Sequence, residues 1–332
     1  RYGIIGCGGI ARGFHLRDMT AIAEVELIAC ADIHVEKAKA MAEEYKAKAY
    51  YEDYHQLLAR DDIDAVIVCT WHETHAAIGA DVLKAGKHVL VQKPMTISIE
   101  DANKLVDAAV EGRKRGLKTY CFPYNWSPPY EKALELIKNG DLGKICQGRC
   151  RVAHGGPGRQ SWFYNPEIAK VGASFDMGVY SVSAITGLMG PAISAVGLVK
   201  SLEPGVRIDD NAIVQLEFAS GAIGSAETSW TQQAAQEGTA IYGTKGTVYL
   251  GWAGHGILVH LNDQRDKGWH TPELPPGMPN APHRHFVQCI LEELPPQGTP
   301  EHGRLVVEIL LAEHESEKTG KRVQLKTTFD WR

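Results

Sequence analysis

The sequence has no strong net charge, no long apolar run and no low-complexity tract, and each absence excludes a class of protein. Its 40 acidic and 35 basic residues leave a net charge of −5, so no positive field gathers phosphates and we expect no nucleic-acid partner. No apolar run approaches the roughly 18 residues that cross a bilayer, so we expect no membrane partner. The 332 residues are 44% hydrophobic, which excludes disorder, collagen-like repeats and disulfide-stapled miniproteins.

The seven cysteines form no C-x-x-C pair, and their odd number is typical of a reducing compartment. Cys7, Cys30 and Cys69 lie in apolar strand-like runs, where a thiol behaves as a small hydrophobe. The chain begins at Arg1 directly in a strand, with neither an initiator Met nor a signal peptide. We therefore expect a cytoplasmic protein, with export as the alternative if a presequence was removed.

The length suggests two domains at about 150 residues each, and the first third alternates short apolar runs with helical patterns. The expected strands are Tyr2–Ile5, Val25–Ala31, Ala49–Tyr50, Ala65–Cys69, His88–Val91 and Lys118–Cys121. The expected helices are Gly9–Ala23, Val35–Tyr45, Tyr54–Ala59, His75–Ala85 and Ile99–Arg113. This order predicts an α/β domain over residues 1–122, a doubly wound parallel sheet with helices on both faces.

The pattern changes after Phe122, where Pro123, Pro128 and Pro129 interrupt any continuing element. The expected strands are Lys144–Ala153, Ala192–Ser201, Asn211–Phe218, Ala222–Trp230, Glu237–Tyr242 and Gly246–Leu250. The expected helices are Tyr130–Lys138, Phe175–Met189, His283–Glu292 and Gly303–Thr319, with Trp269–Pro282 as a loop. We therefore predict a second domain over residues 123–332, of α+β type with a large, mostly antiparallel open sheet, whose C-terminal helix is able to pack back on the first domain.

A glycine-rich turn joins the first strand to the first helix and matches the dinucleotide-binding fingerprint. Gly6 permits the tight turn, and Gly8 lets the backbone approach a pyrophosphate at the helix N-terminus. Gly9 and Ile10 continue the turn, and the small Ala11 allows close packing of helix on strand. The context therefore predicts a dinucleotide site.

Asp32 ends the second strand, 24 residues after Gly8, where a carboxylate accepts hydrogen bonds from the adenosine ribose. Its negative charge would repel a 2′-phosphate, so NAD is favoured over NADP. His34 and Lys37 follow closely and would tolerate a phosphate, which keeps NADP as the minority alternative.

Two polar segments follow the next two predicted strands, at the sheet edge where open α/β folds bind ligands. They read Thr70-Trp71-His72-Glu73-Thr74-His75 and Val91-Gln92-Lys93-Pro94. His72 and His75 are three residues apart and do not fit the zinc motif H-E-x-x-H, so we expect no metal.

The glycine turn, Asp32, these two segments and a later Asp176-Met177-Gly178-Val179-Tyr180 resemble the glucose-fructose oxidoreductase / inositol dehydrogenase / rhizopine-catabolism (Gfo/Idh/MocA) family. The resemblance extends to Ile241–Thr247 and His283–Ile290. It implies a Rossmann domain followed by an α+β substrate domain, and an NAD(P)-dependent oxidoreductase.

The family usually has T-P-N-x-x-H in the first segment and E-K-P in the second. Thr70 and His75 match, whereas Trp71, His72 and Gln92 depart. A neutral amide at position 92 is able to hydrogen-bond the nicotinamide ribose but supports the charge of a neighbouring lysine less than a glutamate would. The cofactor-binding residues implied here are Thr70, Trp71, His75, Gln92 and Trp162.

The resemblance also implies the catalytic residues. The ammonium of Lys93 lies near the nicotinamide and polarises the substrate oxygen, and relatives hold the Lys93–Pro94 bond in cis, which we predict here. Asp176 and Tyr180 are four residues apart and so share one face of the expected helix. Tyr180 would relay the proton, because a nearby Lys93 ammonium favours its phenolate, and Asp176 would orient the reacting groups.

Further residues are assigned to the substrate side. His154 follows a strand and feeds a glycine-rich loop, so it either faces the substrate or caps a turn. Tyr124 and Asn125 match a family segment at the domain junction, and Trp162 matches a tryptophan that relatives place near the cofactor. Packing alone explains these three residues about as well.

These features together predict an NAD-dependent oxidoreductase that transfers a hydride between nicotinamide and a ring hydroxyl or carbonyl of a sugar, glycoside or polyol. The alternatives are a redox-neutral enzyme that cleaves glycosides with retained NAD, a dihydrodiol dehydrogenase, and a non-catalytic NAD sensor. Relatives associate through the outer face of the large sheet, which implies a homodimer or homotetramer.

Overall fold

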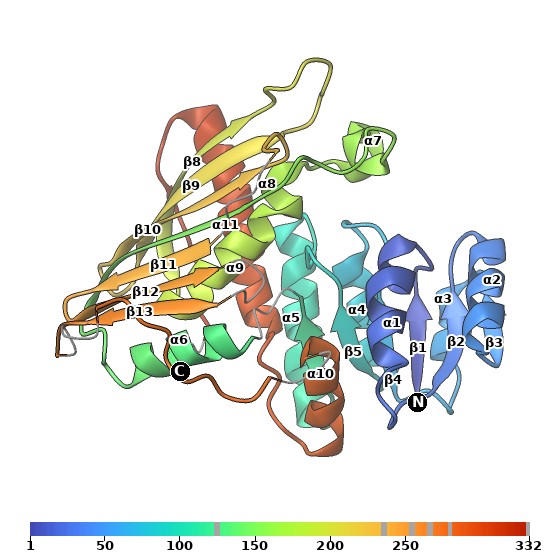
Figure 1. Cartoon of the computed structure of the whole chain (residues 1–332). Helices are drawn as coiled ribbons and strands as arrows, with labels where there is room; N and C mark the ends of the chain where they lie inside the picture. The colour runs from blue at the N-terminus through green and yellow to red at the C-terminus, as the bar shows by residue number, and fades with distance from the viewer. Residues whose placement is uncertain (123–126, 234–237, 252–255, 264–267, 278–280, 330–332) are drawn as a thin grey trace. The chain divides into compact units, whose positions relative to one another are not determined.

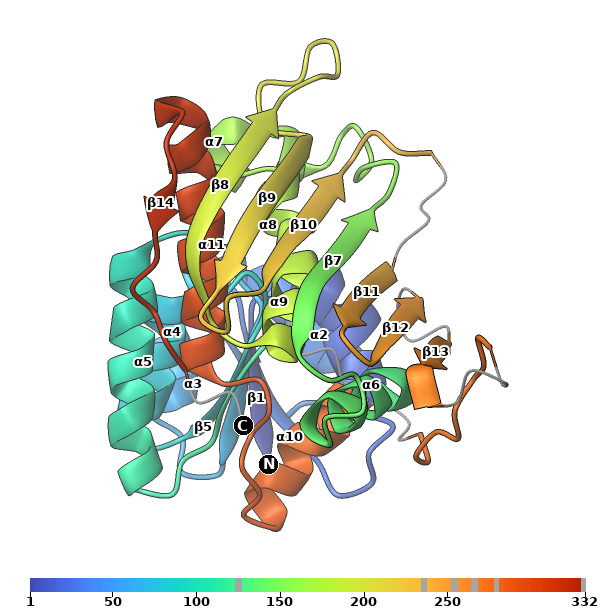
Figure 2. The ribbon, with the colours of Figure 1, turned by 90° about the vertical axis from the view of Figure 1, so that its left-hand side faces the viewer.

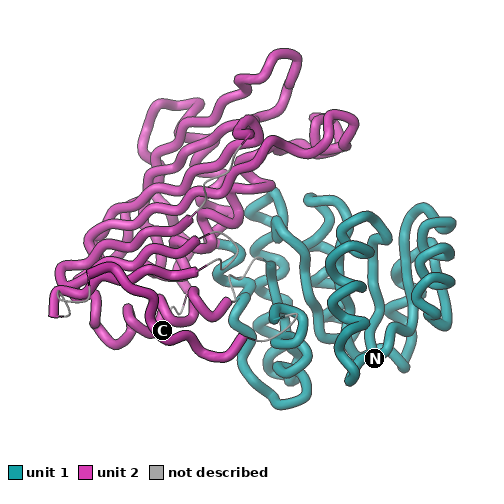
Figure 3. The backbone as a smooth tube through the Cα atoms, in the orientation of Figure 1, with its two compact units in different colours: residues 1–124, 278–304 teal, residues 125–277, 305–332 magenta. Residues whose placement is uncertain are grey.

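The computed structural model describes residues 1–122, 127–233, 238–251, 256–263, 268–277 and 281–329 (Figure 1). The chain divides into two compact units, shown in Figure 3. Unit 1 contains residues 1–124 and 278–304, and unit 2 contains residues 125–277 and 305–332. Each unit is built around its own sheet.

The sheet of unit 1 has six strands in the order β3-β2-β1-β4-β5-β6, all paired in parallel, which confirms the predicted Rossmann topology. The strands are β1 (Tyr2–Ile5), β2 (Leu27–Ala31), β3 (Ala49–Tyr51), β4 (Ala65–Val68), β5 (His88–Val91) and β6 (Thr119–Cys121). Every residue of β1, β2 and β4 is buried, as expected where helices cover both faces of a parallel sheet.

The helices of unit 1 agree with the predicted pattern apart from the first. They are α2 (Val35–Tyr45), α3 (Tyr54–Leu58), α4 (His75–Lys84), α5 (Ile99–Lys114) and α10 (Ala281–Leu291). Phe286 of α10 packs in the same core cluster as Ile4, Ile67 and Leu90, which explains why this late segment folds with unit 1.

The first helix differs from the expected α-helix over Gly9–Ala23. The chain instead forms a π-helical stretch, η1 (Ala11–Leu16), followed by the short α1 (Arg17–Met19). His15 and Leu16 are fully buried in this wide winding, and His15 makes side-chain hydrogen bonds there. The 3.6-residue periodicity of apolar residues predicts an α-helix and cannot show that a polar side chain such as His15 is buried and hydrogen-bonded. π-Helical turns are frequent at functional sites.

Unit 2 contains an eight-stranded sheet in the order β13-β12-β11-β7-β10-β9-β8-β14 (Figure 2). Its strands are β7 (Ile145–Ala153), β8 (Ala192–Lys200), β9 (Asn211–Phe218), β10 (Ile223–Ser229), β11 (Gly238–Gly243), β12 (Gly246–Gly251), β13 (Ile257–Leu261) and β14 (Val323–Gln324). The β7–β10 pair is parallel and the others are antiparallel, which confirms the mostly antiparallel sheet. Strands β13 and β14, which form the two edges of the sheet, were not predicted from the sequence.

The helices of unit 2 include two corrections to the predicted boundaries. They are α6 (Pro128–Lys138), η2 (Trp162–Tyr164), α7 (Pro166–Ala169), α8 (Ala173–Asp176), α9 (Gly178–Met189) and α11 (Pro300–Thr319), which begins in unit 1. Pro128 and Pro129 begin α6 rather than interrupting the chain, because Ser127 caps its N-terminus and proline is tolerated in a first helical turn. The helix expected over Phe175–Met189 is divided at Met177 into α8 and α9.

The two faces of this sheet differ in what covers them. Helix α9 packs on β7, β10 and β11, and Figure 2 shows the sheet with α9 behind it. The opposite side carries large exposed hydrophobic side chains from β8, β9, β10, β11, β12 and β13, which we call the outer face: Ile193, Val196, Leu198, Ile213, Ile223, Tyr242, Tyr249 and Leu258.

Candidate active site

The glycine turn after β1 has the geometry that close approach of a ligand requires. Gly6 has a φ of +92°, and a Cβ atom there would lie 2.5 Å from the carbonyl oxygen of Cys69. Gly8 and Gly9 are exposed, and a Cβ atom on either would meet nothing within 4 Å. Ile10 is 46% exposed beside them. The turn is therefore closed toward the sheet and open outward, as a pyrophosphate-binding turn must be.

Asp32 holds this turn against the end of β2. One carboxylate oxygen accepts the backbone N–H of Cys7 at 2.7 Å, and the other accepts that of His34 at 2.8 Å. Each carboxylate oxygen has two lone pairs, so the half-buried side chain keeps capacity for two ribose hydroxyls. The residues present thus fit an adenine dinucleotide, and the structural contribution of Asp32 to the turn was not foreseen.

His75 connects the loops that follow β4 and β5. Its Nδ1 lies 2.8 Å from the carbonyl oxygen of Pro94, and its Nε2 lies 2.9 Å from that of Thr70. Burial lowers the pKa of His75 to about 4, although both carbonyl contacts act in the opposite direction. Trp71 is 42% exposed in the same loop. The structure therefore brings together Thr70 and His75, two of the residues predicted in these loops, with Pro94, the proline beside Lys93.

Gln92 and Lys93 follow β5 at the same edge of the sheet. Lys93 is half-buried, and the Lys93–Pro94 peptide bond is cis, as predicted. Gln92 is buried: its Oε1 accepts the backbone N–H of Lys93 at 2.6 Å, and its Nε2 lies 3.1 Å from Nε2 of His15. The amide expected to face the ribose therefore has partners within unit 1 at both its oxygen and its nitrogen.

Asp176 and Tyr180 lie on either side of the break at Met177. Asp176 ends α8, is buried and accepts the indole N–H of Trp230 at 3.1 Å. Tyr180 is half-buried in the first turn of α9, and its backbone N–H bonds the carbonyl oxygen of Met177 at 3.0 Å. Asp176 and Tyr180 therefore lie on two helices joined at Met177 and not on one continuous helix as predicted. The contact of Trp230 with Asp176 was not predicted, because the two residues are 54 positions apart in the sequence.

The remaining predicted residues have mixed outcomes. His154 caps a turn, since its Nδ1 accepts the backbone N–H of Gly156 at 2.8 Å, so the second of its two expected roles is observed. Trp162 is half-buried in η2 and stacks on Phe163 with ring centroids 4.1 Å apart. Tyr124 and Asn125 lie outside the described residues.

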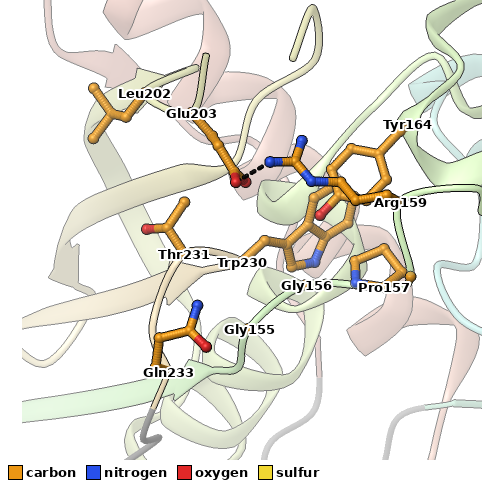
Figure 4. Close-up of a pocket in the computed structure, with 11 residues that line it drawn as sticks. Gly155, Gly156, Pro157, Arg159, Tyr164, Leu202, Glu203, Trp230, Thr231 and Gln233 are labelled. Atoms are coloured by element: carbon orange, nitrogen blue, oxygen red, sulfur yellow. Dashed lines mark hydrogen bonds and ion pairs between the residues drawn. The ribbon is translucent and has the colours of Figure 1, made fainter. Parts of the chain in front are cut away.

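A pocket of about 480 Å³ opens in unit 2 beside the loop after β7 (Figure 4). Arg159 and Tyr164 line one side. The guanidinium carbon of Arg159 lies 5.6 Å from the centroid of the Tyr164 ring, and a guanidinium nitrogen forms an ion pair with Glu203. Trp230 and Thr231 line another side, and it is the indole of Trp230 that holds Asp176. This pocket therefore adjoins one of the predicted catalytic residues. Arg159 in the glycine-rich loop was the available sequence signal for it.

Two negative findings apply to the described residues. Within them, no group of three or more histidine, cysteine, aspartate or glutamate side chains is placed to hold a metal ion. Across the same part of the chain, no helix has the length and apolar character needed to cross a membrane.

A parallel six-stranded sheet with an open glycine turn and an acidic residue after its second strand defines a dinucleotide-binding protein. A family model described as "Oxidoreductase family, NAD-binding Rossmann fold" matches residues 1–119. A second model, described as "GFO/IDH/MocA C-terminal domain", matches residues 130–249. The chain belongs to the Gfo/Idh/MocA oxidoreductase family, and its first unit is the NAD-binding domain of that family.

Named relatives and solved structures resemble the chain over most of its length. The myo-inositol 2-dehydrogenase of Thermotoga maritima is 26% identical over 81% of this chain and 80% of its own. The D-glucoside 3-dehydrogenase of Escherichia coli K12 is 25% identical over 98% and 97%. The aldose-aldose oxidoreductase of Caulobacter crescentus has a TM-score of 0.85 at 21% identity, covering 98% of this chain and 99% of that one, which shows the shared fold. GenD2 of gentamicin A biosynthesis, solved with NAD, has a TM-score of 0.82 at 27% identity over 98% and 96%.

Proposed function

We propose that the protein is an NAD-dependent dehydrogenase that oxidises a ring hydroxyl of a sugar, glycoside or polyol. The observation that carries this proposal is the shared edge of one sheet: β1 and β5 lie on either side of β4, so the open glycine turn and Lys93 both follow strands that end there. Open α/β sheets bind their ligands at this edge. The inositol and glucoside dehydrogenases among the relatives support the substrate class.

NAD, when bound, supplies the hydride acceptor. Gly6, Gly8, Gly9 and Asp32 would hold it, and the carboxylate of Asp32 disfavours the extra phosphate of NADP. Lys93 in unit 1 would donate a hydrogen bond to the reacting oxygen and stabilise negative charge on it as its proton leaves.

Unit 2 would supply the groups that handle this proton and bind the rest of the substrate. Tyr180 would accept the hydroxyl proton, and Asp176, held by Trp230, would orient the reacting groups. The pocket beside Arg159 and Thr231 is of the size of small-molecule sites, which span roughly 300–1,000 Å³. Its polar side chains suit a ligand rich in hydroxyl groups.

We also propose that copies of the chain associate through the outer face of the sheet. Eight large hydrophobic side chains are exposed there, and exposed apolar patches of this kind mark interaction surfaces. A face that meets its own copy forms a closed two-fold dimer.

The test is NADH absorbance after mixing the protein with NAD and a panel of free sugars, glycosides, inositols and dihydrodiols, with NADP in parallel. We expect NADH with one class of sugar or polyol and a lower rate with NADP. Cleavage of a glycoside without net NADH would instead show redox-neutral chemistry, and NADH only from dihydrodiols would overturn the substrate class. Binding of NAD with no reaction on any compound would favour a sensor.

A further inference from the structure

A chain of polar side chains runs from the backbone of Lys93 into the interior of unit 1. Its first link is the 2.6 Å bond from the N–H of Lys93 to Oε1 of Gln92, and its second is the 3.1 Å contact between Nε2 of Gln92 and Nε2 of His15. Nδ1 of His15 then lies 2.9 Å from Nε2 of His283, and Nδ1 of His283 lies 3.3 Å from Oδ2 of Asp18. We call this the Gln92–Asp18 chain.

The Gln92–Asp18 chain is enclosed by apolar side chains. His15 and His283 have no exposed surface, and Gln92 and Asp18 are 5% and 6% exposed. Phe14 packs with its ring centroid 5.0 Å from that of His15 and 4.8 Å from that of His283. Most buried polar groups in such surroundings form hydrogen bonds with one another.

The charge state of the chain follows from its surroundings. Burial, together with the neighbouring His283, holds the pKa of His15 well below its usual value, so His15 is neutral. His75 also faces His15, and burial lowers the pKa of His75 to about 4. Arg17 donates to the second oxygen of Asp18 at 2.8 Å.

The Lys93 end fixes the direction of the hydrogen bonds. A backbone N–H only donates, so the amide oxygen of Gln92 faces Lys93 and its NH₂ group faces His15. Nε2 of His15 is then an acceptor, and the proton of this neutral ring is on Nδ1. His15 therefore donates to Nε2 of His283.

The Asp18 end favours the same direction. Nδ1 of His283 makes no well-aligned hydrogen bond, but it lies 3.3 Å from Oδ2 of Asp18, and a carboxylate favours a proton on the nitrogen that faces it. Burial acts to raise the pKa of Asp18, but His283 and Arg17 outweigh it and hold that pKa below its usual value. The charge of Asp18 thus favours the direction that the Lys93 end fixes: every proton in the chain points away from Lys93 and toward Asp18.

We propose that the Gln92–Asp18 chain is a one-directional positioning device for Lys93, and that it requires an amide at position 92. The proposal rests on the proposed function for the catalytic role of Lys93, but the hydrogen-bond direction does not depend on it. This requirement explains why position 92 departs from the family pattern E-K-P. A carboxylate there only accepts, so it would need a donor at Nε2 of His15 as well as the N–H of Lys93. Nε2 of His15 is a donor only if the direction of the chain is reversed.

A glutamate at position 92 would require one additional proton. Its free oxygen would need an N–H at Nε2 of His15, which leaves Nδ1 of His15 as an acceptor and turns Nε2 of His283 into a donor. Nδ1 of His283 would then present a lone pair to Asp18 unless the chain took up a proton. Gln92→Glu should therefore bind a proton on folding and lose stability, relative to the wild type, as pH rises.

The first experiment is a reversal of the chain by two substitutions. In Gln92→Glu with Asp18→Asn, the asparagine NH₂ is able to donate to Nδ1 of His283, which allows every link to run toward position 92 with no additional proton. We expect Gln92→Glu alone to lower Tm, more at pH 8 than at pH 6, and to lower kcat by about 10- to 100-fold with little change in NAD affinity. Addition of Asp18→Asn should recover most of both losses.

The matched control is Asp18→Asn alone, which should cost little because its amide oxygen is still able to face the Nδ1–H group of His283. If the double variant is less stable than Gln92→Glu, or if the Tm loss of Gln92→Glu is the same at both pH values, the proposal is wrong.

A second measurement is independent of activity. The ¹⁵N shifts of labelled histidines in the wild-type protein report which ring nitrogen holds the proton, and we expect the Nδ1–H form for both His15 and His283 at pH 7.5. An Nε2–H form of either ring would overturn the direction. A protein with these tautomers but no dehydrogenase activity would keep the chain and reject the proposed function instead.

Discussion

The single residue Asp32 has two roles, one in the structure of the glycine turn and a proposed one in cofactor binding. Its carboxylate accepts the N–H groups of Cys7 and His34, which fixes the glycine turn relative to β2, and it presents negative charge where the ribose of NAD is expected. A hydrogen bond from a backbone N–H to a charged group contributes about 1.5–3 kcal/mol. Cofactor selection and local stability are therefore coupled through one side chain.

We predict that Asp32→Ala weakens NAD binding and reduces the preference for NAD over NADP. The loss of the carboxylate removes both the ribose acceptors and the charge that repels a 2′-phosphate. Fluorescence titration with NAD and NADP measures both affinities, and a Tm measurement reports the lost support of the turn. An unchanged ratio of the two affinities would show that Asp32 does not select the cofactor.

The position of some site residues could be predicted from the sequence, whereas the contacts of others could not. Gly6, Asp32 and Lys93 belong to short motifs with fixed spacing, so their positions in the fold could be predicted. Trp230 and His283 act on residues 54 and 268 positions away, on Asp176 and His15, and no local pattern encodes such contacts. The amide of Gln92 was assigned to the ribose because its buried partner could not be foreseen.

Among the elements of unit 1, the glycine turn requires glycine at Gly6, whereas the helix that follows it does not require glycine at Gly13. Gly6 is held at φ +92° against Cys69, whereas Gly13 lies exposed within η1, where a Cβ atom would meet nothing within 4 Å. The same residue type is therefore required in the turn and dispensable in the helix.

We predict that Gly6→Ala lowers the free energy of unfolding by at least about 2 kcal/mol, because it adds a backbone clash to an unfavourable φ. Gly13→Ala is the matched control and should raise the same quantity by up to about 1 kcal/mol, since alanine favours helix. Urea denaturation measures both. Equal effects of the two substitutions would contradict the description of the turn.

Strand positions followed from apolar runs and turn residues, and β1, β5 and β9 have the predicted limits. Helix winding was harder to predict: the π-helical η1 and the break at Met177 depend on side-chain contacts made after the chain folds. The short β14 pairs through two residues only, a length too small to leave a periodic signal.

At the scale of the whole molecule, the outer face of unit 2 is the feature that a single chain leaves unexplained. Leu198 is 60% exposed there on β8, and Ile223 is 57% exposed on β10. Such a face is expected to be covered in solution.

We predict that the protein sediments as a dimer or tetramer and that Leu198→Glu shifts it toward monomer, because a charge buried at an apolar contact is costly. Leu291→Glu is the control, since Leu291 is 63% exposed in α10 of unit 1. Sedimentation equilibrium distinguishes the outcomes. A monomeric wild type at micromolar concentration, or an equal effect of both substitutions, would reject association through the outer face.

We expect the first unit to bind NAD and Lys93, at the edge of the same sheet, to act on the substrate. The most direct test measures NAD affinity by calorimetry and kcat by NADH absorbance in the wild type and in Lys93→Ala. We expect Lys93→Ala to lower kcat by about 100-fold or more and to leave NAD affinity nearly unchanged. A parallel loss of NAD binding, or turnover that survives the substitution, would contradict it.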